Sequence, residues 1–351
     1  MHNQQITASK FKRVKDLVAW MGALQAQDYN MAKWAIGIRL PSSTDQSVED
    51  ALNNGEIIRT HLLRPTWHIV SSSDIYWMLE LTAPHLKPIL RARFKQLEIS
   101  EELVSKSKSV IEKALIGGNH LTRDEIMLQL EKANIEAVNL RLSHLMMACE
   151  LDGMFCSGAA KGKKLTYALL EERISKPSSV PRSEALAELA RRYFTSHGPA
   201  TLQDFIWWSG LPVKDARSAL ESVKGEFISA QVSQQTLWFS EPCTPDQIDN
   251  ESAHLLPAYD EFIISYRDRN ASIAAKNHKN AISDNGIFRP ILVANGQIKG
   301  IWKRTQKKEK VLIEPEYFEA NEPLSNELIE KASAHYSHFL NCKTEIQNQT
   351  H

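Results

Sequence analysis

Two small groups of polar residues in the first 70 positions have the types and spacing that chemistry could use. The first group is Gln25 and Gln27, separated by Ala26 in the segment LQAQDY. Side chains two positions apart point away from each other in a helix but share a side in an extended segment. A glutamine amide is a negligible base at neutral pH, yet its carbonyl can accept a hydrogen bond and orient a water molecule. Alternatively, both residues only satisfy backbone groups where the preceding helix ends.

Arginine and histidine side chains form the second group, within the segment RTHLLRPTWH. Its members are Arg59, His61, Arg64 and His68. Their N–H groups are suited to contacting phosphate oxygens. Strand alternation would place Arg64 and His68 on one side, although Pro65 could disturb the register. A surface edge strand that is protected by charge would have the same composition.

The motifs of several common enzyme classes are absent from the chain. There is no P-loop, no dinucleotide-binding fingerprint, and no metalloprotease or serine-hydrolase motif. The cysteines have neither C-x-x-C nor zinc-finger spacing, which predicts free thiols in a reducing cytosol. No apolar run is long enough to span a membrane, and residues 1–11 do not have the pattern of a signal peptide. We therefore expect a cytoplasmic protein that needs no metal and no cofactor. The four cysteines are Cys149, Cys156, Cys243 and Cys342.

The elements that would position these groups follow an order that is clearest between residues 99 and 175. A helix is predicted over 103–116, and Thr122 with Glu125 forms a capping box that starts a short second helix. A third helix, over 138–151, precedes a hairpin with a basic tip. This order is typical of a winged helix, whose wing tip commonly contacts phosphates. The tip lysines are Lys161, Lys163 and Lys164.

The same order returns about 79 residues later, where Thr201 takes the place of Thr122. Helices are predicted over 184–196 and 212–224, followed by a hairpin over 226–239. Residues 1–95 have a comparable order, including a strand–turn–strand around Pro65. Repetition on this scale indicates tandem copies of one supersecondary unit. We therefore predict three winged helices in a row.

The predicted architecture is an α+β fold with four regions. Strands are expected after residue 245, with a hairpin turn at Asn295–Gly296 and a closing helix over 323–341. Helices are also expected over 45–53, 73–81 and 84–97. The late strands are predicted over 254–264, 287–294, 297–303 and 309–314. The regions are three winged helix-turn-helix units at 1–98, 99–175 and 182–245, then a small β-rich, barrel-like region with the closing helix at 246–345.

Five stretches of this sequence resemble the AlkZ-type winged-helix DNA glycosylase family. They occur in the family's order across nearly the whole chain. The stretches are LQAQDY (24–29), IIRTHLLRPTWHIV (57–70), HGPATLQDFIWWSGL (197–211), HLLPAYDEFIISYRDR (254–269) and NGIFRPILVANGQIKGIWKR (285–304).

The resemblance implies a concave surface for double-stranded DNA and hydrolysis of an N-glycosidic bond by the Gln-x-Gln pair. A sister branch of the family has Gln-x-Asp, and Asp28 is one position too late to supply that carboxylate. We therefore assign Gln25 and Gln27 to water positioning. Two glutamines suit an alkylated purine, whose positive charge already activates it as a leaving group.

The remaining assignments concern DNA contacts and structural roles. We expect Arg64 and His68 to contact a phosphate or sugar near the lesion, Arg59 and His61 to support them, and the wing lysines to contact backbone phosphates. Asp260 and Arg289 have no chemical role in this interpretation, and an interdomain salt bridge or a strand-end bond is expected for each. Trp207 and Trp208 are expected in the core.

Two other functions remain open on the sequence, and the charge balance bears on both. The protein could be a non-catalytic DNA-binding regulator, or an interaction module that has lost DNA binding. Lys plus Arg number 42 and Asp plus Glu number 42, so the formal net charge is zero. Basic residues nevertheless concentrate at 85–95, 161–164 and 299–310, which would allow a neutral chain to bind phosphate if they face one surface. We expect a monomer that binds double-stranded DNA.

Overall fold

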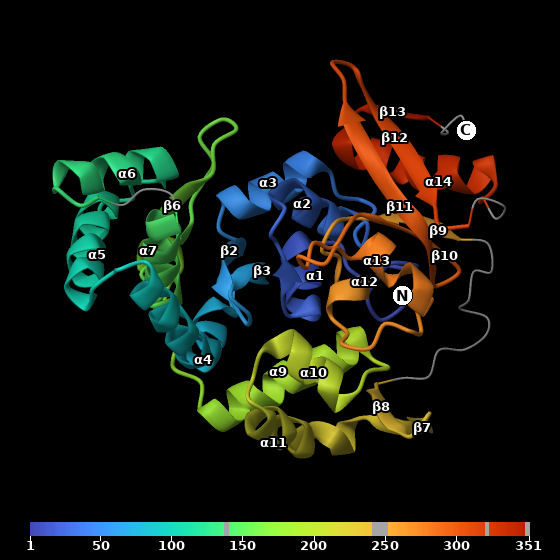
Figure 1. The fold of residues 1–351 in the computed structure, drawn as a ribbon, viewed down its shortest axis with the longest axis horizontal. Helices are drawn as coiled ribbons and strands as arrows, with labels where there is room; N and C mark the ends of the chain where they lie inside the picture. Colours follow the sequence, from blue (N-terminus) through green and yellow to red (C-terminus); the bar gives the residue numbers. More distant parts are fainter. Residues whose placement is uncertain (137–139, 241–251, 320–322, 348–351) are drawn as a thin grey trace.

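The fold is taken from a computed structural model, which describes residues 1–136, 140–240, 252–319 and 323–347. Figure 1 shows the elements of residues 1–71 in the middle, with three other groups of elements around them. Residues 99–173 lie on one side, residues 182–239 lie below, and the C-terminal sheet lies on the opposite side. The N-terminal region is therefore the part that the other three regions surround.

The N-terminal region contains helices α1 to α3 and a three-stranded sheet. The spacing of the apolar residues of α1 buries Val14, Leu17, Val18 and Met21 on one face. The sheet has the order β1-β3-β2, and its β2–β3 hairpin confirms the predicted turn around Pro65. The elements are α1 (Val14–Met21), β1 (Leu24–Gln25), α2 (Tyr29–Gly37), α3 (Asp45–Asn53), β2 (Ile57–Leu62) and β3 (Thr66–Ser71).

A single long helix, α4 (Ile75–Gln96), follows, and the prediction of two separate helices was wrong. Pro84 and Pro88 lie inside α4, although each removes a backbone donor. One face of α4 packs Leu86 and Leu90 against Met147 and Leu151. The burial of this apolar face stabilises the continuous helix more than the prolines disfavour it.

The second region repeats the element order of the first. Its sheet has the order β4-β6-β5, with the same arrangement of strands as in the N-terminal region. The predicted capping box at Thr122 and Glu125 is confirmed, because each side chain bonds the other residue's backbone N–H. The elements are α5 (Glu101–Leu115), β4 (Leu121–Thr122), α6 (Arg123–Lys132), α7 (Leu140–Leu151), β5 (Phe155–Ser157), β6 (Thr166–Leu169) and α8 (Leu170–Arg173).

The third region has the order again, with an isolated bridge in place of the first strand. Ala200 pairs with Trp238 at the position that β1 and β4 take in the other two regions. Thr201 and Asp204 form a capping box at the start of the second helix. The elements are α9 (Arg182–His197), α10 (Leu202–Ser209), α11 (Val213–Val223), η1 (Lys224–Glu226), β7 (Ile228–Val232) and β8 (Gln235–Phe239).

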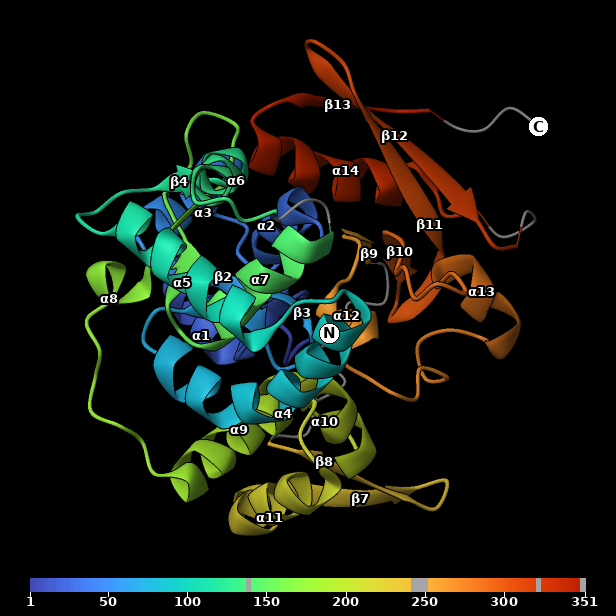
Figure 2. The same ribbon diagram turned by 60° about the vertical axis from the view of Figure 1, so that its left-hand side comes forward.

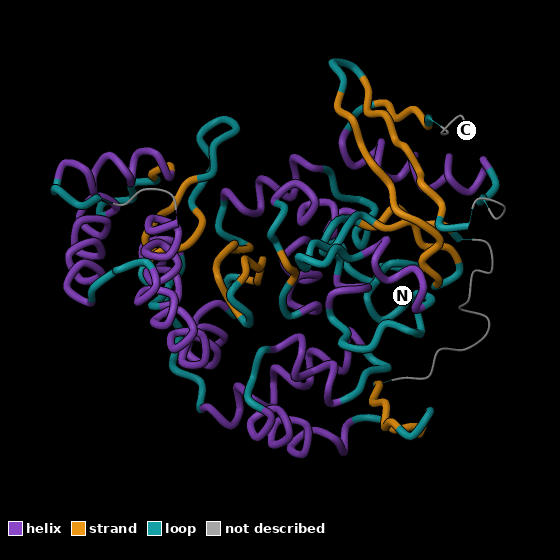
Figure 3. Tube along the Cα trace, viewed as in Figure 1, coloured by secondary structure: helices purple, strands orange, loops and turns teal. Residues whose placement is uncertain are grey.

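The C-terminal region is an open, curled five-stranded sheet with the order β13-β12-β11-β10-β9. Helix α14 lies along this sheet (Figure 2), and Figure 3 separates its long strands from the short strands of the other regions. The predicted turn at Asn295–Gly296 is confirmed, since both residues have a positive φ between β10 and β11. The elements are β9 (Ala253–Leu256), α12 (Glu261–Ile264), η3 (Ala275–Asn277), α13 (His278–Ala281), β10 (Ile291–Ala294), β11 (Gln297–Gln306), β12 (Lys310–Tyr317), α14 (Asn326–Leu340) and β13 (Lys343–Ile346).

One C-terminal prediction was wrong, and one strand was missed. The strand predicted over 254–264 ends at Leu256, and the chain then turns into α12 because Asp260 caps Phe262. Strand β13 was not predicted, because its alternation of apolar and polar residues is short. It pairs in parallel with β12, from which it is separated in sequence by α14. Cys243 and the predicted boundary between residues 245 and 246 lie outside the described residues.

A buried ion pair joins the N-terminal and C-terminal regions. The two terminal nitrogens of Arg39 donate to the two carboxylate oxygens of Asp260 at 2.8 and 2.7 Å, and both side chains are fully buried. Arg39 also donates to Gln4 Oε1 and to the Ala35 carbonyl. This pair confirms the salt bridge that was expected for Asp260.

The first testable prediction concerns this pair. Asp260→Ala should lower the free energy of unfolding by about 3–5 kcal/mol, because it leaves the Arg39 guanidinium buried without its partner. Thr122→Ala, which removes one helix cap, should cost only about 1 kcal/mol. Denaturant unfolding of both variants beside the parent measures the difference. Equal losses would show that the Arg39–Asp260 pair does not stabilise the fold more than a single helix cap does.

Candidate active site

Gln25 lies where β1 pairs with β3, opposite His68. Its side chain is nearly buried, with 6% of the residue exposed. Its backbone N–H donates to Glu261 Oε1 at 2.7 Å, and its Oε1 accepts from Arg64 Nη2 at 2.8 Å. The backbone and the amide orientation of Gln25 are therefore both held by charged groups.

Gln27 differs from Gln25 in its surroundings, because its side chain is exposed. The extended backbone continues past β1, since the Ala26 N–H donates to the Trp67 carbonyl at 2.7 Å. This confirms the extended backbone predicted at Gln25, whereas Gln27 itself lies in a bend that leads into α2. Asp28 is used to start α2, because its carboxylate accepts from the Met31 N–H at 3.0 Å.

Arg64 is the predicted arginine that reaches the glutamine motif. It follows Leu63, whose positive φ of 56° turns the chain between β2 and β3. The end of α10 fixes this turn from outside, since a Cβ at Gly210 would lie only 2.5 Å from the Leu63 carbonyl oxygen. Helix α10 therefore sits directly on the Arg64 turn.

His68 is fully buried, and burial lowers its pKa to about 3, with the charge of Arg64 contributing. Its ring is neutral at physiological pH, and Nδ1 donates to the Thr66 carbonyl at 3.1 Å. Nε2 then carries only a lone pair, and it has no hydrogen-bond partner among the described residues. In this conformation the ring offers no N–H donor to a phosphate, and the contact of His68 with a phosphate or sugar stays a prediction.

Arg59 and His61 are tied to structure more than the prediction assumed. Arg59 Nε donates to the Ala26 carbonyl at 3.1 Å, and its guanidinium lies 4.3 Å from the Trp67 ring centre. His61 Nδ1 contacts the Glu150 carboxylate of α7. Arg59 thus holds the glutamine segment and His61 joins the first region to the second, while the support expected from both for Arg64 and His68 stays a prediction.

Glu261 is the residue of this site that sequence reasoning missed. It is 1% exposed and accepts from the Gln25 N–H, from Trp208 Nε1 at 3.1 Å and from the Ser265 hydroxyl. Burial alone would raise its pKa, but His197, Ser265 and Arg64 lower it, so Glu261 is ionised at neutral pH. Its only sequence signal was its place in the stretch PAYDEF, where no role had been assigned.

Trp207 also departs from prediction. Trp208 is fully buried as expected, but Trp207 is 40% exposed. The indole Nε1 of Trp207 donates to the Ile264 carbonyl at 2.8 Å, and the Arg64 guanidinium lies 6.0 Å from its ring centre. The core assignment for Trp207 was wrong, because α10 turns this side chain toward the Arg64 turn.

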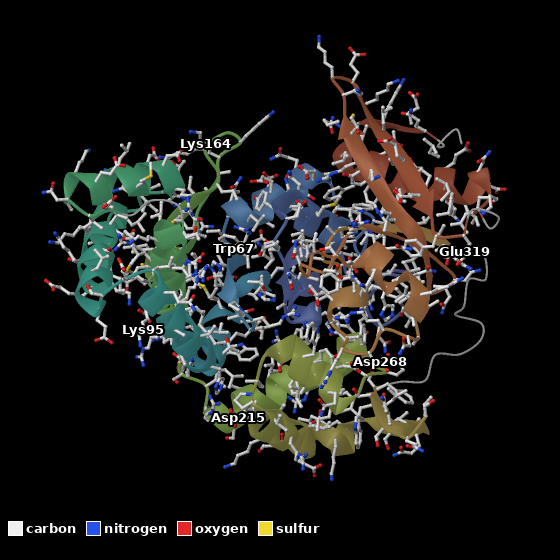
Figure 4. All side chains as sticks on the ribbon, in the orientation of Figure 1. Trp67, Lys95, Lys164, Asp215, Asp268 and Glu319 are labelled. Carbon is white, nitrogen blue, oxygen red and sulfur yellow. The ribbon has the colours of Figure 1, made fainter. Side chains whose placement is uncertain are left out.

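The lysines predicted at the wing are exposed on the loop between β5 and β6, where Figure 4 labels Lys164. Two of them have acidic partners on α6: Lys161 with Glu125 at 3.0 Å and Lys164 with Asp124 at 3.4 Å. Lys163 is exposed as well. A phosphate would have to compete with these carboxylates for Lys161 and Lys164.

The other two basic stretches are partly neutralised in the same way. Lys87 pairs with Asp152. On the hairpin of β11 and β12, Lys303 pairs with Glu316 and Lys310 pairs with Glu345. Acidic and basic groups therefore mix more closely in space than the sequence suggested. Among the described residues, no helix is both long and apolar enough to cross a membrane.

Comparison with known proteins gives a consistent result. The family model described as "DNA glycosylase AlkZ-like" matches residues 18–339. A protein named "Interstrand DNA cross-link repair glycosylase", from Streptomyces sahachiroi, is 23% identical over 346 residues, which cover 91% of this chain and 89% of the relative. The solved structure titled "Streptomyces sahachiroi DNA glycosylase AlkZ" matches with a TM-score of 0.78 at 18% identity, covering 99% of this chain and 96% of the other.

The extent of the family match defines the class of the protein, which is a DNA glycosylase. More narrowly, the chain belongs to the AlkZ-like family. The structural likeness, at its low identity, shows the shared fold. The sequence resemblance to this family is therefore confirmed.

A second testable prediction follows from the burial of His68. A pKa near 3 in the folded state lies below the ordinary 6.5, so the unfolded state binds more protons as pH falls and stability decreases. Between pH 7 and pH 5 this group should cost about 2 kcal/mol of folding free energy. Denaturant unfolding at both pH values should show a smaller loss in His68→Gln than in the parent. His338→Gln, at an exposed position, should keep the parent's loss, and an unchanged loss in His68→Gln would contradict the assignment.

Proposed function

We propose that this protein hydrolyses the N-glycosidic bond of purines alkylated at N7 or N3, including bulky and crosslinked adducts, in double-stranded DNA. The observation that carries the proposal is the held amide of Gln25 next to the exposed Gln27. The name of the Streptomyces sahachiroi relative, which refers to interstrand cross-link repair, supports the choice of lesion.

The chemistry follows from what two amides can and cannot do. Water attacks C1′ as the C1′–N bond breaks, and the bonding electron pair leaves with the purine. An alkylated purine starts with a positive charge and departs neutral, so the leaving group needs no proton from the enzyme. The water loses its proton to solvent after attack, so its oxygen needs orientation more than a strong base. Amide carbonyls supply that orientation.

The two glutamines take different parts in this mechanism. Gln25 Oε1 already accepts one hydrogen bond from Arg64, which leaves it one lone pair for the water. Gln27 is exposed and supplies the second contact. Asp28, the nearest carboxylate in sequence, is used in the α2 cap and does not act as the base. The neutral Nε2 of His68 adds a further acceptor at the same strand pair.

The arrangement of the surrounding regions supports DNA as the substrate. The order helix, strand or bridge, helix, helix, hairpin occurs three times, and we interpret the three regions as winged helices. In this interpretation the exposed wing at Lys161, Lys163 and Lys164 contacts backbone phosphates. The same proposal includes that the protein is a cytoplasmic monomer and that the reaction needs no metal.

A third testable prediction addresses the glutamines directly. Single-turnover release of 7-methylguanine, and of a nitrogen-mustard crosslink, from duplex DNA should fall about 100-fold in Gln25→Ala and in Gln27→Ala, because loss of water positioning has effects of this size. Gln46→Ala, an exposed glutamine on α3, should act at the parent's rate.

Two outcomes would contradict the proposal. Full activity in the Gln25→Ala, Gln27→Ala double variant would exclude the amide mechanism. Salt-sensitive duplex binding by the parent, with no base released from any of these substrates, would favour the non-catalytic DNA-binding protein instead.

A further inference from the structure

The exposed Trp207 lies between the Arg64 turn and the chain that follows α12. Its Nε1 hydrogen bond to the Ile264 carbonyl fixes the indole on α10. A second guanidinium, that of Arg269, lies 5.3 Å from the Trp207 ring centre, while that of Arg64 lies 6.0 Å away. One fixed aromatic ring therefore contacts two arginines from different parts of the chain.

In each of the two arginines, some guanidinium nitrogens donate hydrogen bonds, while one buried nitrogen has no hydrogen-bond partner among the described residues. Arg64 donates a hydrogen bond from Nη2 to Gln25 Oε1. Arg269 donates from Nε to the Ile263 carbonyl at 2.8 Å and from Nη1 to the Arg267 carbonyl at 3.3 Å. Arg64 Nε and Arg269 Nη2 are buried and have no hydrogen-bond partner among the described residues. Buried N–H groups of this kind normally bind an acceptor.

Carboxylates oppose both charges, Glu261 that of Arg64 and Asp204 with Asp268 that of Arg269, but none of them forms a direct pair with either guanidinium. Within the described ranges, the side-chain hydrogen bonds of Arg64 and Arg269 go to an amide oxygen and to backbone carbonyls, and not to a carboxylate. Burial lowers the pKa of Arg269 and the nearby charge of Arg64 lowers it further, against the opposing charges of Asp204 and Asp268. The Asp204 carboxylate already accepts hydrogen bonds from the Thr201 hydroxyl and from the backbone N–H groups of Arg267 and Asp268. Asp268 is labelled in Figure 4. The cluster therefore has positive charge available to an anion.

The surrounding packing holds this cluster in place before any ligand binds. Gly210 ends α10 in a left-handed conformation against Leu63, which seats Trp207 beside the Arg64 turn. Trp208, the next residue to Trp207, is fixed by Glu261, which also holds the Gln25 backbone. The cationic cluster and the glutamine motif are thus positioned by the same buried carboxylate.

We propose that Arg64, Trp207 and Arg269 form a binding site for a phosphodiester group of the lesion-containing DNA strand. Arg269 is the phosphate ligand that sequence reasoning did not identify, and Trp207 is a positioning residue that keeps the two guanidiniums apart and oriented. The inference rests on the proposed function, because it takes the Gln25 segment as the place where the damaged nucleotide is held. A phosphate bound here would set the distance between that nucleotide and the glutamines.

The fourth testable prediction uses the salt dependence of binding to an undamaged duplex. Losing one phosphate contact lowers the slope of log affinity against log salt by about 0.9, and Arg269→Gln should lower it by up to this amount, with weaker binding, because Arg64 remains at the same phosphate. Arg269→Lys should keep the slope, because its charge remains while the planar fork is lost. Arg191→Gln is the matched control, since Arg191 is paired with Glu188 and Glu226 and should not alter the slope.

Trp207 is tested beside Arg269 by its own pair of variants. Trp207→Leu should weaken duplex binding, and Trp207→Phe should keep most of the parent's affinity. When Arg269→Gln is added to Trp207→Leu, the salt slope should still fall. An Arg269→Gln slope equal to the parent's would overturn the phosphate site. Loss of slope in Arg269→Lys equal to that in Arg269→Gln would also overturn it, since it would show a structural role for Arg269.

The failure of this site and the failure of the proposed function give different results. If the parent releases alkylated bases but Arg269→Gln keeps the full salt slope, only the phosphate site is wrong. If the parent releases no base but Arg269→Gln lowers the slope, the phosphate site stands and the glycosylase mechanism fails.

Discussion

Two consecutive buried carboxylates, Asp260 and Glu261, are the constraint on which the rest of the structure depends. Asp260 closes a bidentate pair with Arg39, and Glu261 accepts from the Gln25 backbone and from Trp208. These contacts join the C-terminal region to the first and third helical regions at one point. Buried charges tolerate few arrangements, because each must be matched by donors of fixed geometry. The relative placement of three regions is therefore specified by polar contacts as well as by apolar packing.

The same constraint explains how a site made of weak functional groups can be well ordered. A glutamine amide contributes to catalysis only when its carbonyl is held in one orientation, since it has little basicity of its own. Arg64 fixes that orientation for Gln25, and Glu261 fixes the backbone beneath it. Burial keeps His68 neutral, so this strand pair adds no imidazolium beside a cationic purine in the proposed reaction. Charge near the glutamines is thus limited to groups that have anchoring bonds.

Local features of this fold could be predicted from sequence, whereas contacts between distant segments could not. The Thr122 and Thr201 capping boxes, the β2–β3 hairpin and the Asn295–Gly296 turn depend on neighbours within a few residues, and all were found. Strand β13 and the uninterrupted α4 depend on packing against remote elements. Glu261 contacts Gln25 across 236 positions of the chain, so no local pattern indicates the bond. The exposure of Trp207 is equally non-local, because Leu63 and Ile264 decide where its indole lies.

The equal numbers of acidic and basic residues acquire a physical meaning in the folded chain. In the proposed contact with DNA, Lys161 and Lys164 would exchange Glu125 and Asp124 for phosphate, so their net gain on binding would be smaller than that of unpaired lysines. Arg64 and Arg269 have no such carboxylate to displace within the part of the chain that the structure describes, and their partly buried charges are screened less by salt. A neutral protein can in this way bind DNA loosely through its exposed surfaces and more firmly at one place. In the proposed reaction that place is next to the glutamines, where a firm contact favours the nucleotide that is to be cleaved.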